Sequence, residues 1–233
     1  MRGMPGAPGP SPLATAYRDR ISAVADGLGA RISGPTIARI AAWFDLLVAW
    51  NAKIDLTAAK SPDELADLML ADALVLARHE PEGEVVVDVG SGAGGPGLAL
   101  YLIRPDLRVT LVEPLQKRVA FLRAASAIVG RAPEGGSLVV ERARAEEIAT
   151  RIQSPGAAKR SAPFACAIAR ATFAPEVWLE RATELVAPGG SAWVLLARDP
   201  PPRAPRWEIS VDETYEWPLT RANRRAVRYK LAV

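Results

Sequence analysis

The stretch from residue 84 to residue 97 constrains the fold of this chain more than any other. Residues 84–89 form a short apolar run, which is typical of a parallel strand buried on both faces. The run ends in a loop that holds four glycines before a helical pattern begins at residue 97. Such glycines allow a tight turn and let a ligand approach the main chain closely. The pattern predicts an α/β domain with a ligand at this loop; the alternative is a connecting turn without a ligand.

The rest of the chain repeats the alternation of strand and helix. Further predicted strands are residues 107–112, 137–140, 164–169 and 191–196. Predicted helices are residues 97–103, 116–129 and 174–186. This order predicts a mostly parallel, doubly wound sheet, with a turn at residues 188–190 feeding its fifth strand. Residues 207–211 and 226–233 predict two strands with no helix between them, and therefore an antiparallel hairpin at the C-terminal end.

The first 82 residues carry no strand pattern. Residues 1–18 are rich in proline and glycine and are expected to be a disordered tail. Residues 19–82 are expected to form an N-terminal helical layer. One helix pattern follows Pro35, and another begins at Ser61, where Glu64 completes a capping box. We therefore expect one domain over residues 19–233, in which these helices precede a Rossmann-like core at residues 83–233.

Composition excludes several classes of protein. No apolar run approaches the roughly 20 residues that span a bilayer, and the start has no apolar segment of the kind found in secretory signals. The single cysteine, Cys166, forms no internal disulfide and is expected to be an inert core thiol. These features predict a cytoplasmic protein without a membrane partner. The net charge of +3 is a mild lean toward anionic partners, although a high arginine content also follows from a GC-rich genome.

The glycine loop fits two classes of nucleoside cofactor. Gly90, Gly92 and Gly95 satisfy the dinucleotide pattern G-x-G-x-x-G. Asp88 and Gly94 add the pattern acid-x-Gly-x-Gly-x-Gly, which resembles the first motif of Rossmann-like methyltransferases. In those enzymes the loop contacts the methionine part of S-adenosyl-L-methionine, and an acid there can orient the ammonium group. We therefore favour this cofactor over a nicotinamide dinucleotide.

Two acidic positions after later strands extend the site. Glu113 ends the second strand, where a carboxylate can accept hydrogen bonds from both ribose hydroxyls of either cofactor class. Its alternative is a solvated acid at a strand end. Ala145 and Glu146 follow the third strand, where a loop meets the adenine ring in Rossmann-like methyltransferases. A charged first helical turn explains these residues equally well.

Several segments together resemble the RsmG (GidB) family, which methylates guanine N7 in small-subunit ribosomal RNA. The matching segments are residues 50–57 (W-N-A-K-I-D-L-T), 88–97 (D-V-G-S-G-A-G-G-P-G), 104–111 (R-P-D-L-R-V-T-L), 117–123 (K-R-V-A-F-L-R), 144–147 (R-A-E-E) and 170–175 (R-A-T-F-A-P). The resemblance covers residues 36–233. It implies an enzyme of the class I methyltransferase fold that uses S-adenosyl-L-methionine and acts on 16S ribosomal RNA.

The resemblance also implies roles for individual residues. Cofactor contacts are expected from Asp88, Gly90, Ser91, Gly92, Gly94, Gly95, Glu113, Ala145, Glu146 and Arg170. Arg170, at the end of the fourth strand, is the candidate catalytic residue because it would face both cofactor and RNA. RNA phosphates are expected at Lys117, Arg144 and Arg198. Guanine N7 carries a free lone pair, so its methylation needs no general base, and no metal is expected.

The chain departs from the family pattern at four positions: Asp55, Met69, Gly95 and Leu196. These departures leave the exact target nucleotide open. The alternatives are a diverged methyltransferase for another RNA site or a small molecule, a nicotinamide-dependent oxidoreductase, or a non-catalytic binding module. Four C-terminal arginines, at positions 221, 224, 225 and 228, are either a solvated hairpin surface or an RNA contact. We expect a monomer.

Overall fold

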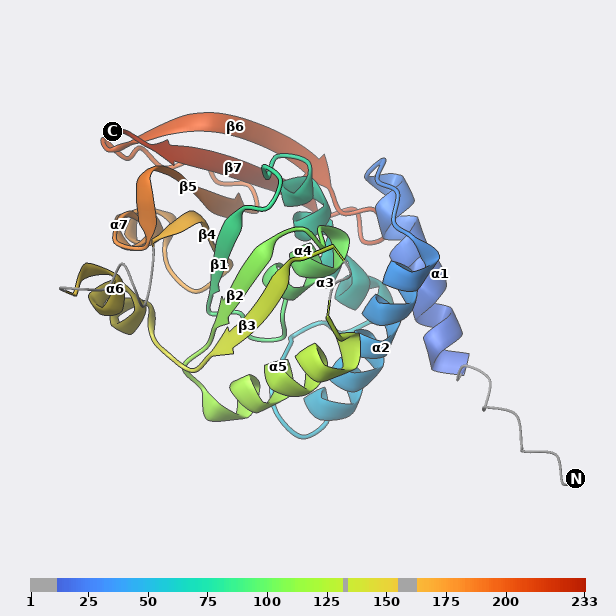
Figure 1. Cartoon of the computed structure of the whole chain (residues 1–233). Coiled ribbons are helices and arrows are strands. Elements are labelled where there is room, and N and C mark those ends of the chain that lie inside the picture. The colour runs from blue at the N-terminus through green and yellow to red at the C-terminus, as the bar shows by residue number, and fades with distance from the viewer. Residues whose placement is uncertain (1–11, 132–133, 155–162) are drawn as a thin grey trace, which may run out of the picture.

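A seven-stranded sheet runs through the centre of the molecule (Figure 1). The computed structural model describes residues 12–131, 134–154 and 163–233. The strand order is β3-β2-β1-β4-β5-β7-β6, and the pairs among β1 to β5 are all parallel. The strands are β1 (Val85–Val89), β2 (Arg108–Val112), β3 (Ser137–Glu141), β4 (Phe164–Ala169), β5 (Val186–Leu196), β6 (Trp207–Glu216) and β7 (Asn223–Leu231). Strand β7 is antiparallel to both β5 and β6. The predicted doubly wound sheet with an antiparallel C-terminal hairpin is confirmed.

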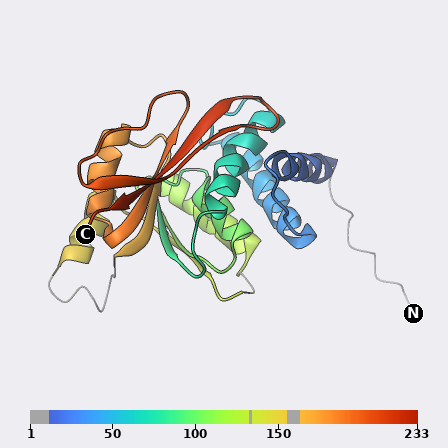
Figure 2. The same cartoon turned by 90° about the horizontal axis from the view of Figure 1, so that it is seen from above.

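Helices cover both faces of this sheet (Figure 2). One face carries α1 (Pro12–Gly27), α2 (Gly34–Asn51), α3 (Pro62–Ala77), α4 (Gly97–Ile103) and α5 (Gln116–Val129); the other carries α6 (Ala145–Gln153) and α7 (Pro175–Thr183). Successive strand residues alternate between the two cores: Val86 packs with the first group of helices and Val87 with the second. The strands therefore read as continuous apolar runs because both of their faces are buried. No helix within the described ranges is long and apolar enough to cross a membrane.

The N-terminal boundary differs from the expected one. Helix α1 begins at Pro12, so residues 12–18, expected within a disordered tail, are helical; residues 1–11 lie outside the described residues. The ring of Tyr17 is buried edge-to-face against Phe44 of α2, with centroids 5.5 Å apart. Ile21, one turn further along α1, is fully buried. This helix depends on a partner that lies far away in the sequence, which local composition does not reveal.

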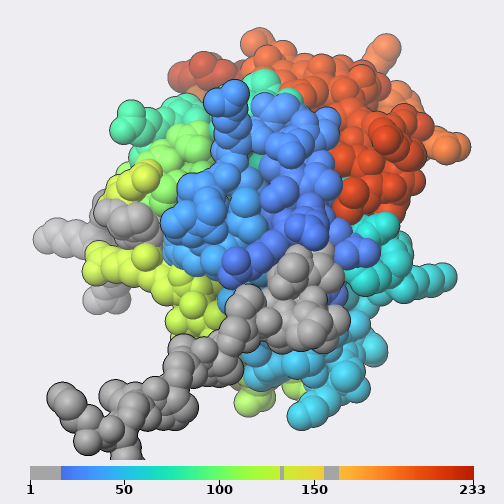
Figure 3. Space-filling model, turned by 90° about the vertical axis from the view of Figure 1, so that its right-hand side faces the viewer, coloured from blue at the N-terminus to red at the C-terminus, as the bar shows by residue number. Residues whose placement is uncertain are grey.

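The N-terminal helices also contact the C-terminal hairpin. A Cβ added to Gly27 would lie 2.6 Å from Pro218 Cβ, so the end of α1 fits closely against the hairpin turn. Arg78, which caps the C-terminus of α3, forms a 2.9 Å ion pair with Glu213 of β6. Figure 3 shows α1 and α2, in blue, beside the C-terminal hairpin, in red.

Two local predictions need correction. Phe164 pairs with Val186 and Cys166 with Ser191, so residues 188–190 form a bulge inside β5 rather than the turn that precedes it. At the start of α3, Ser61 Oγ accepts from Glu64 N at 3.1 Å, as a cap should. The reciprocal bond of a capping box is displaced by one residue, because Glu64 Oε2 accepts from Lys60 N at 2.8 Å.

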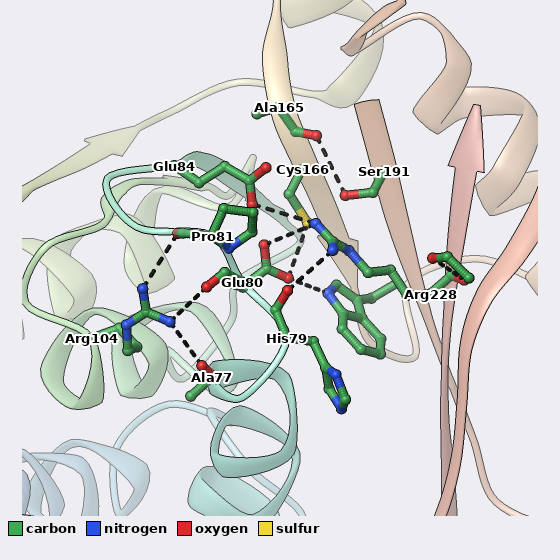
Figure 4. A network of polar contacts seen from close by, with 12 residues as sticks. Ala77, His79, Glu80, Pro81, Glu84, Arg104, Ala165, Cys166, Ser191 and Arg228 are labelled. Carbon is green, nitrogen blue, oxygen red and sulfur yellow. Dashed lines mark hydrogen bonds and ion pairs between the residues drawn. The ribbon is translucent and has the colours of Figure 1, made fainter. Parts of the chain in front are cut away.

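A buried polar network ties the hairpin to the amino ends of the parallel strands (Figure 4). Glu80 is fully buried in the loop between α3 and β1, and accepts hydrogen bonds from Trp193 Nε1 and, at 3.5 Å, from Arg228 Nη2. Arg228 also lies 3.5 Å from Glu84 Oε2. Burial raises the pKa of the Cys166 thiol, which contacts Glu80 and is the expected buried thiol. This network lies at the end of the sheet opposite the glycine loop.

Candidate active site

The sheet changes winding direction between β1 and β4. The chain leaves β1 for α4 on one face and leaves β4 for α7 on the other, although the two strands are direct neighbours. In open α/β sheets the crevice at such a switch point, beyond the carboxyl ends of the strands, is where ligands bind. Two segments enclose it here: the glycine loop of residues 90–97 and residues 170–174.

The glycine loop is held by contacts from β2 and α2. Val112 O, at the end of β2, accepts from Gly90 N at 2.8 Å and from Ser91 N at 3.2 Å. The fully buried indole of Trp43 on α2 donates from Nε1 to Ala93 O at 3.1 Å. Sequence reasoning missed Trp43, because nothing near it in the chain indicates that it reaches the loop. The loop is therefore fixed in place before any ligand binds.

Asp88 lies beneath this loop. Its side chain is almost completely buried, and Oδ2 accepts from Gly97 N at 3.2 Å, at the start of α4. Burial raises the pKa of this carboxyl to about 6, although Ser91 and the Arg170 guanidinium both act to lower it. Ser91 is also buried, and its Oγ donates to Asp88 O at 2.8 Å. Asp88 and Ser91 thus support the loop from below; their expected contact with a cofactor stays a prediction.

The glycines of the loop differ in what surrounds them. Gly90 has a φ of +76°, and a Cβ there would overlap the side chain of Thr172. Gly92 also has a positive φ, +52°, but a Cβ there would meet only Gly90 O, at 3.8 Å. Gly94 packs against Trp43 and Leu98. Among these three loop glycines, Gly92 is therefore the one with open space beside it, where a ligand can reach the main chain.

Glu113 reaches the open glycine from the end of β2. Its Oε2 accepts from Gly92 N at 3.0 Å, and its Oε1 accepts from Leu115 N at 2.9 Å. The residue is only 2% exposed, so the alternative of a solvated strand-end acid is wrong. Each carboxylate oxygen has a second lone pair. Glu113 can therefore hold the loop and still accept hydrogen bonds from a ribose.

A surface hollow continues from Glu113 toward α6. It is lined by Pro114, Leu115, Arg142, Ala143, Arg144 and Glu147. Leu115 is 54% exposed, which is unusual for a leucine and offers an apolar face to a flat ring. The two residues expected here do not line it: Ala145 is buried inside α6, and Glu146 forms a 3.3 Å ion pair with Arg181. Leu115 and Ala143 were missed, although each lies three residues after the end of a predicted strand.

Arg170 lies at the end of β4, on the other side of the crevice. Its Nη1 donates to Leu68 O and forms a 3.2 Å ion pair with Asp72 Oδ2, both on α3. A Cβ added to Gly95 would lie 3.1 Å from Arg170 Nη2, so the guanidinium lies against the glycine loop. Ala171, which follows, has a φ of +55°, a conformation uncommon outside glycine. The Cβ added to Gly95 would also lie 3.2 Å from the Met69 backbone, so a larger residue at Gly95 fits only if these neighbours move.

The three basic residues expected at RNA all surround the carboxyl end of the sheet. Lys117 lies in the first turn of α5, Arg144 precedes α6 and Arg198 follows β5. All three are exposed, and none forms an ion pair with an acid in the part of the chain that the structure describes.

The C-terminal arginines behave differently. Ion pairs join Arg221 to Glu216 at 3.0 Å and Arg225 to Asp212 at 2.6 Å. Arg224 stacks over the ring of a buried tryptophan at 3.8 Å, and Arg228 belongs to the polar network of Figure 4. All four arginines thus interact with other residues of the protein. This favours the interpretation that they form a hairpin surface rather than an RNA contact.

The W-N segment at the end of α2 shapes the loop that follows. Asn51 Oδ1 accepts from Leu56 N at 2.9 Å and from Thr57 N at 3.0 Å. The ring of Trp50 packs edge-to-face on Phe121 of α5, with centroids 5.8 Å apart. These residues join the helical layer to α5, the helix that carries Lys117, and so fix the rim of the site.

A sheet of this order, with an antiparallel strand between β5 and β6 and a ligand crevice at the end of β1, defines a class I methyltransferase that uses S-adenosylmethionine. The comparisons with known proteins narrow the class to one family. The family model described as rRNA small subunit methyltransferase G (GidB) matches residues 36–200, and the chain belongs to this family. The resemblance found in the sequence is therefore confirmed.

The relatives agree with this assignment. The chain is 30% identical over 222 residues to a protein of Anaeromyxobacter dehalogenans named ribosomal RNA small subunit methyltransferase G, covering 92% of this chain and 98% of the relative. A protein of the same name from Salinispora tropica is 40% identical over 150 residues, covering 63% and 56%. A solved structure of a mutant of MtNAS has a TM-score of 0.53 at 13% identity, covering 96% of this chain and 88% of that one, and shows likeness of fold alone.

Proposed function

We propose that this protein transfers the methyl group of S-adenosylmethionine to guanine N7 in 16S ribosomal RNA. The observation that carries the proposal is the open face of Gly92 above Glu113, in a chain that belongs to the rRNA small subunit methyltransferase G family. Membership of a methyltransferase family argues against the nicotinamide-dependent alternative, which the glycine pattern alone left open.

The residues present fit the cofactor. Gly92 offers bare main chain, Glu113 has lone pairs for the ribose hydroxyls, and Leu115 offers an apolar face for the adenine. When bound, the cofactor supplies an activated methyl group on a sulfonium. The role of Asp88 and the remaining glycines is to hold the loop in the shape that receives it.

The reaction itself requires no acid–base catalysis by the protein. Guanine N7 forms the new bond with a lone pair that carries no proton, so no general base is needed. The one histidine of the sequence, His79, lies far from the glycine loop, 2.8 Å from Glu213 of the hairpin. The chain's contribution is to hold the purine in line with the methyl group at near-attack distance. Arg170, beside the loop, is our candidate for that task.

The substrate would be gripped through its phosphates. Lys117, Arg144 and Arg198 are exposed around the crevice and form no ion pair with any acid in the described ranges, which suits backbone contacts that fix the position of the RNA. The target purine must leave its stack or be reached in a loop, at a cost of a few kcal/mol. A cytoplasmic location follows from this substrate, and a monomeric state remains our prediction.

Mapping of the methyl group tests the proposal. Purified protein is incubated with labelled S-adenosylmethionine and with either 16S rRNA or small subunits from a strain that lacks the gene. Reduction followed by aniline cleaves RNA at 7-methylguanosine, and primer extension then locates the site. We expect one cleavage, absent with the variant Gly92→Arg. Label at another position of the rRNA, or on small molecules only, would favour the diverged alternatives and refute the proposed substrate.

A further inference from the structure

A buried carboxylate connects the C-terminal hairpin to the candidate catalytic arginine. Asp72 of α3 is 3% exposed and contacts three residues, one at the end of β4 and two in the C-terminal hairpin. Arg170, at the end of β4, approaches Asp72 Oδ2 at 3.2 Å. On the other oxygen, Oδ1, Tyr215 OH of β6 donates at 2.6 Å and Trp217 Nε1 at 3.4 Å. Asp72 thus receives donors from the end of β4 on one carboxylate oxygen and from the hairpin on the other.

The geometry leaves part of Arg170 available. Nη1 is used by Leu68 O and Asp72. Nη2 lies beside Gly95, and among the described residues neither Nη2 nor Nε donates a hydrogen bond, while 18% of the side chain is exposed. With one edge of the planar guanidinium bound to α3, its orientation toward the loop is set by where Asp72 points. Rotation of the Asp72 carboxylate would move the guanidinium.

The two hairpin donors fix the Asp72 carboxylate. The hydroxyl bond of Tyr215 is short, and burial raises the pKa of Tyr215 further above its ordinary value, so the group stays a donor. The indole of Trp217 is buried and is covered by the guanidinium of Arg224 at 3.8 Å. We propose that Asp72, Tyr215 and Trp217 are positioning residues that orient Arg170 for methyl transfer. This inference rests on the proposed function and adds the hairpin to the machinery of the same site.

A pair of tyrosine variants tests the positioning role. Tyr215→Phe removes the hydroxyl that faces Asp72. Tyr229→Phe is the matched control: this buried hairpin tyrosine donates to Pro202 O at 2.7 Å, away from Arg170. The first readout is the guanidinium NMR signal of Arg170, assigned by its loss in Arg170→Lys. We expect this signal to shift or broaden in Tyr215→Phe and to stay in place in Tyr229→Phe.

The second readout is turnover on RNA. A misplaced reacting group slows an enzyme strongly, so we expect kcat to fall about tenfold in Tyr215→Phe with KM for RNA unchanged, and to stay near the wild-type value in Tyr229→Phe. In the Arg170→Lys background the Tyr215→Phe change should have no further effect, because the two residues act as one unit. A residue that matters only for folding would give additive losses instead.

The outcomes separate the two proposals. Equal effects of the two tyrosine variants on the Arg170 signal, or additive losses of kcat, would overturn the positioning role while leaving the methyltransferase intact. A wild-type protein that methylates no RNA would refute the proposed substrate, and the NMR comparison would then still decide whether the hairpin orients Arg170.

Discussion

Replacement of Gly92 by arginine should abolish cofactor binding without unfolding the protein. Gly92 has a φ of +52°, and its amide donates to Glu113 Oε2 at 3.0 Å. A side chain at this position would grow into open space, because an added Cβ meets only Gly90 O, at 3.8 Å. The matched control is Gly92→Ala, which has the same backbone requirement with a single added methyl group.

The structure gives the size of the effect on stability. A left-handed conformation costs a residue other than glycine about 1–2 kcal/mol. Since neither variant overlaps a neighbour at Cβ, this backbone term should dominate for both. For a chain of this length, each kcal/mol lowers the Tm by about 2–4 °C. We therefore expect both variants to melt about 2–8 °C below the wild type, with cooperative transitions.

Binding then separates the two variants. Calorimetry with S-adenosylmethionine should detect no heat for Gly92→Arg, because the long side chain occupies the path of the cofactor, and a smaller loss of affinity for Gly92→Ala. Wild-type affinity in the arginine variant would show that the cofactor binds elsewhere. A much larger fall of Tm for arginine than for alanine would show that the space above Gly92 is closed.

Three further predictions concern residues around the site and the network of Figure 4. Burial, with hydrogen bonding to a neighbouring carboxyl, raises the pKa of Glu84 from 4.5 to about 8. The folded state thus keeps a proton on Glu84 that the unfolded chain releases, so the contribution of Glu84 to stability is greatest below pH 4.5 and is lost as the pH rises to about 8. Urea denaturation between these pH values should show a slope that is smaller in Glu84→Gln. Trp43→Phe removes the indole hydrogen bond to Ala93 O and leaves a buried carbonyl unpaired. The free energy of unfolding should fall by about 1–3 kcal/mol, and cofactor binding should weaken. An unchanged affinity for S-adenosylmethionine would mean that Trp43 does not fix the loop. Glu113→Gln replaces one acceptor oxygen by a donor that cannot pair with a backbone amide, so calorimetry should show weaker binding of S-adenosylmethionine, and wild-type affinity would remove Glu113 from the ribose site.

Much of the fold could be read from local patterns. The apolar runs that became β1 and β4 are continuous because both of their faces are buried, and helix α5 has the predicted bounds. The start of helix α1 could not be predicted from the sequence, because its Tyr17 is buried only through contact with Phe44 on another helix. The sequence predicts a turn where β5 has a bulge, because consecutive glycines such as Gly189 and Gly190 are compatible with either structure.

The sequence by itself determined the glycine loop and the acid that follows it, because these depend on spacing within a few residues of a strand end. Only the tertiary structure decided which glycine stays open, since Gly90 faces Thr172 whereas Gly92 faces nothing close. It also decided that Arg170 is bound to Asp72, and Asp72 to Tyr215. Residues that lie so far apart in the chain interact only after their elements have packed, and periodicity along the sequence carries no record of that packing.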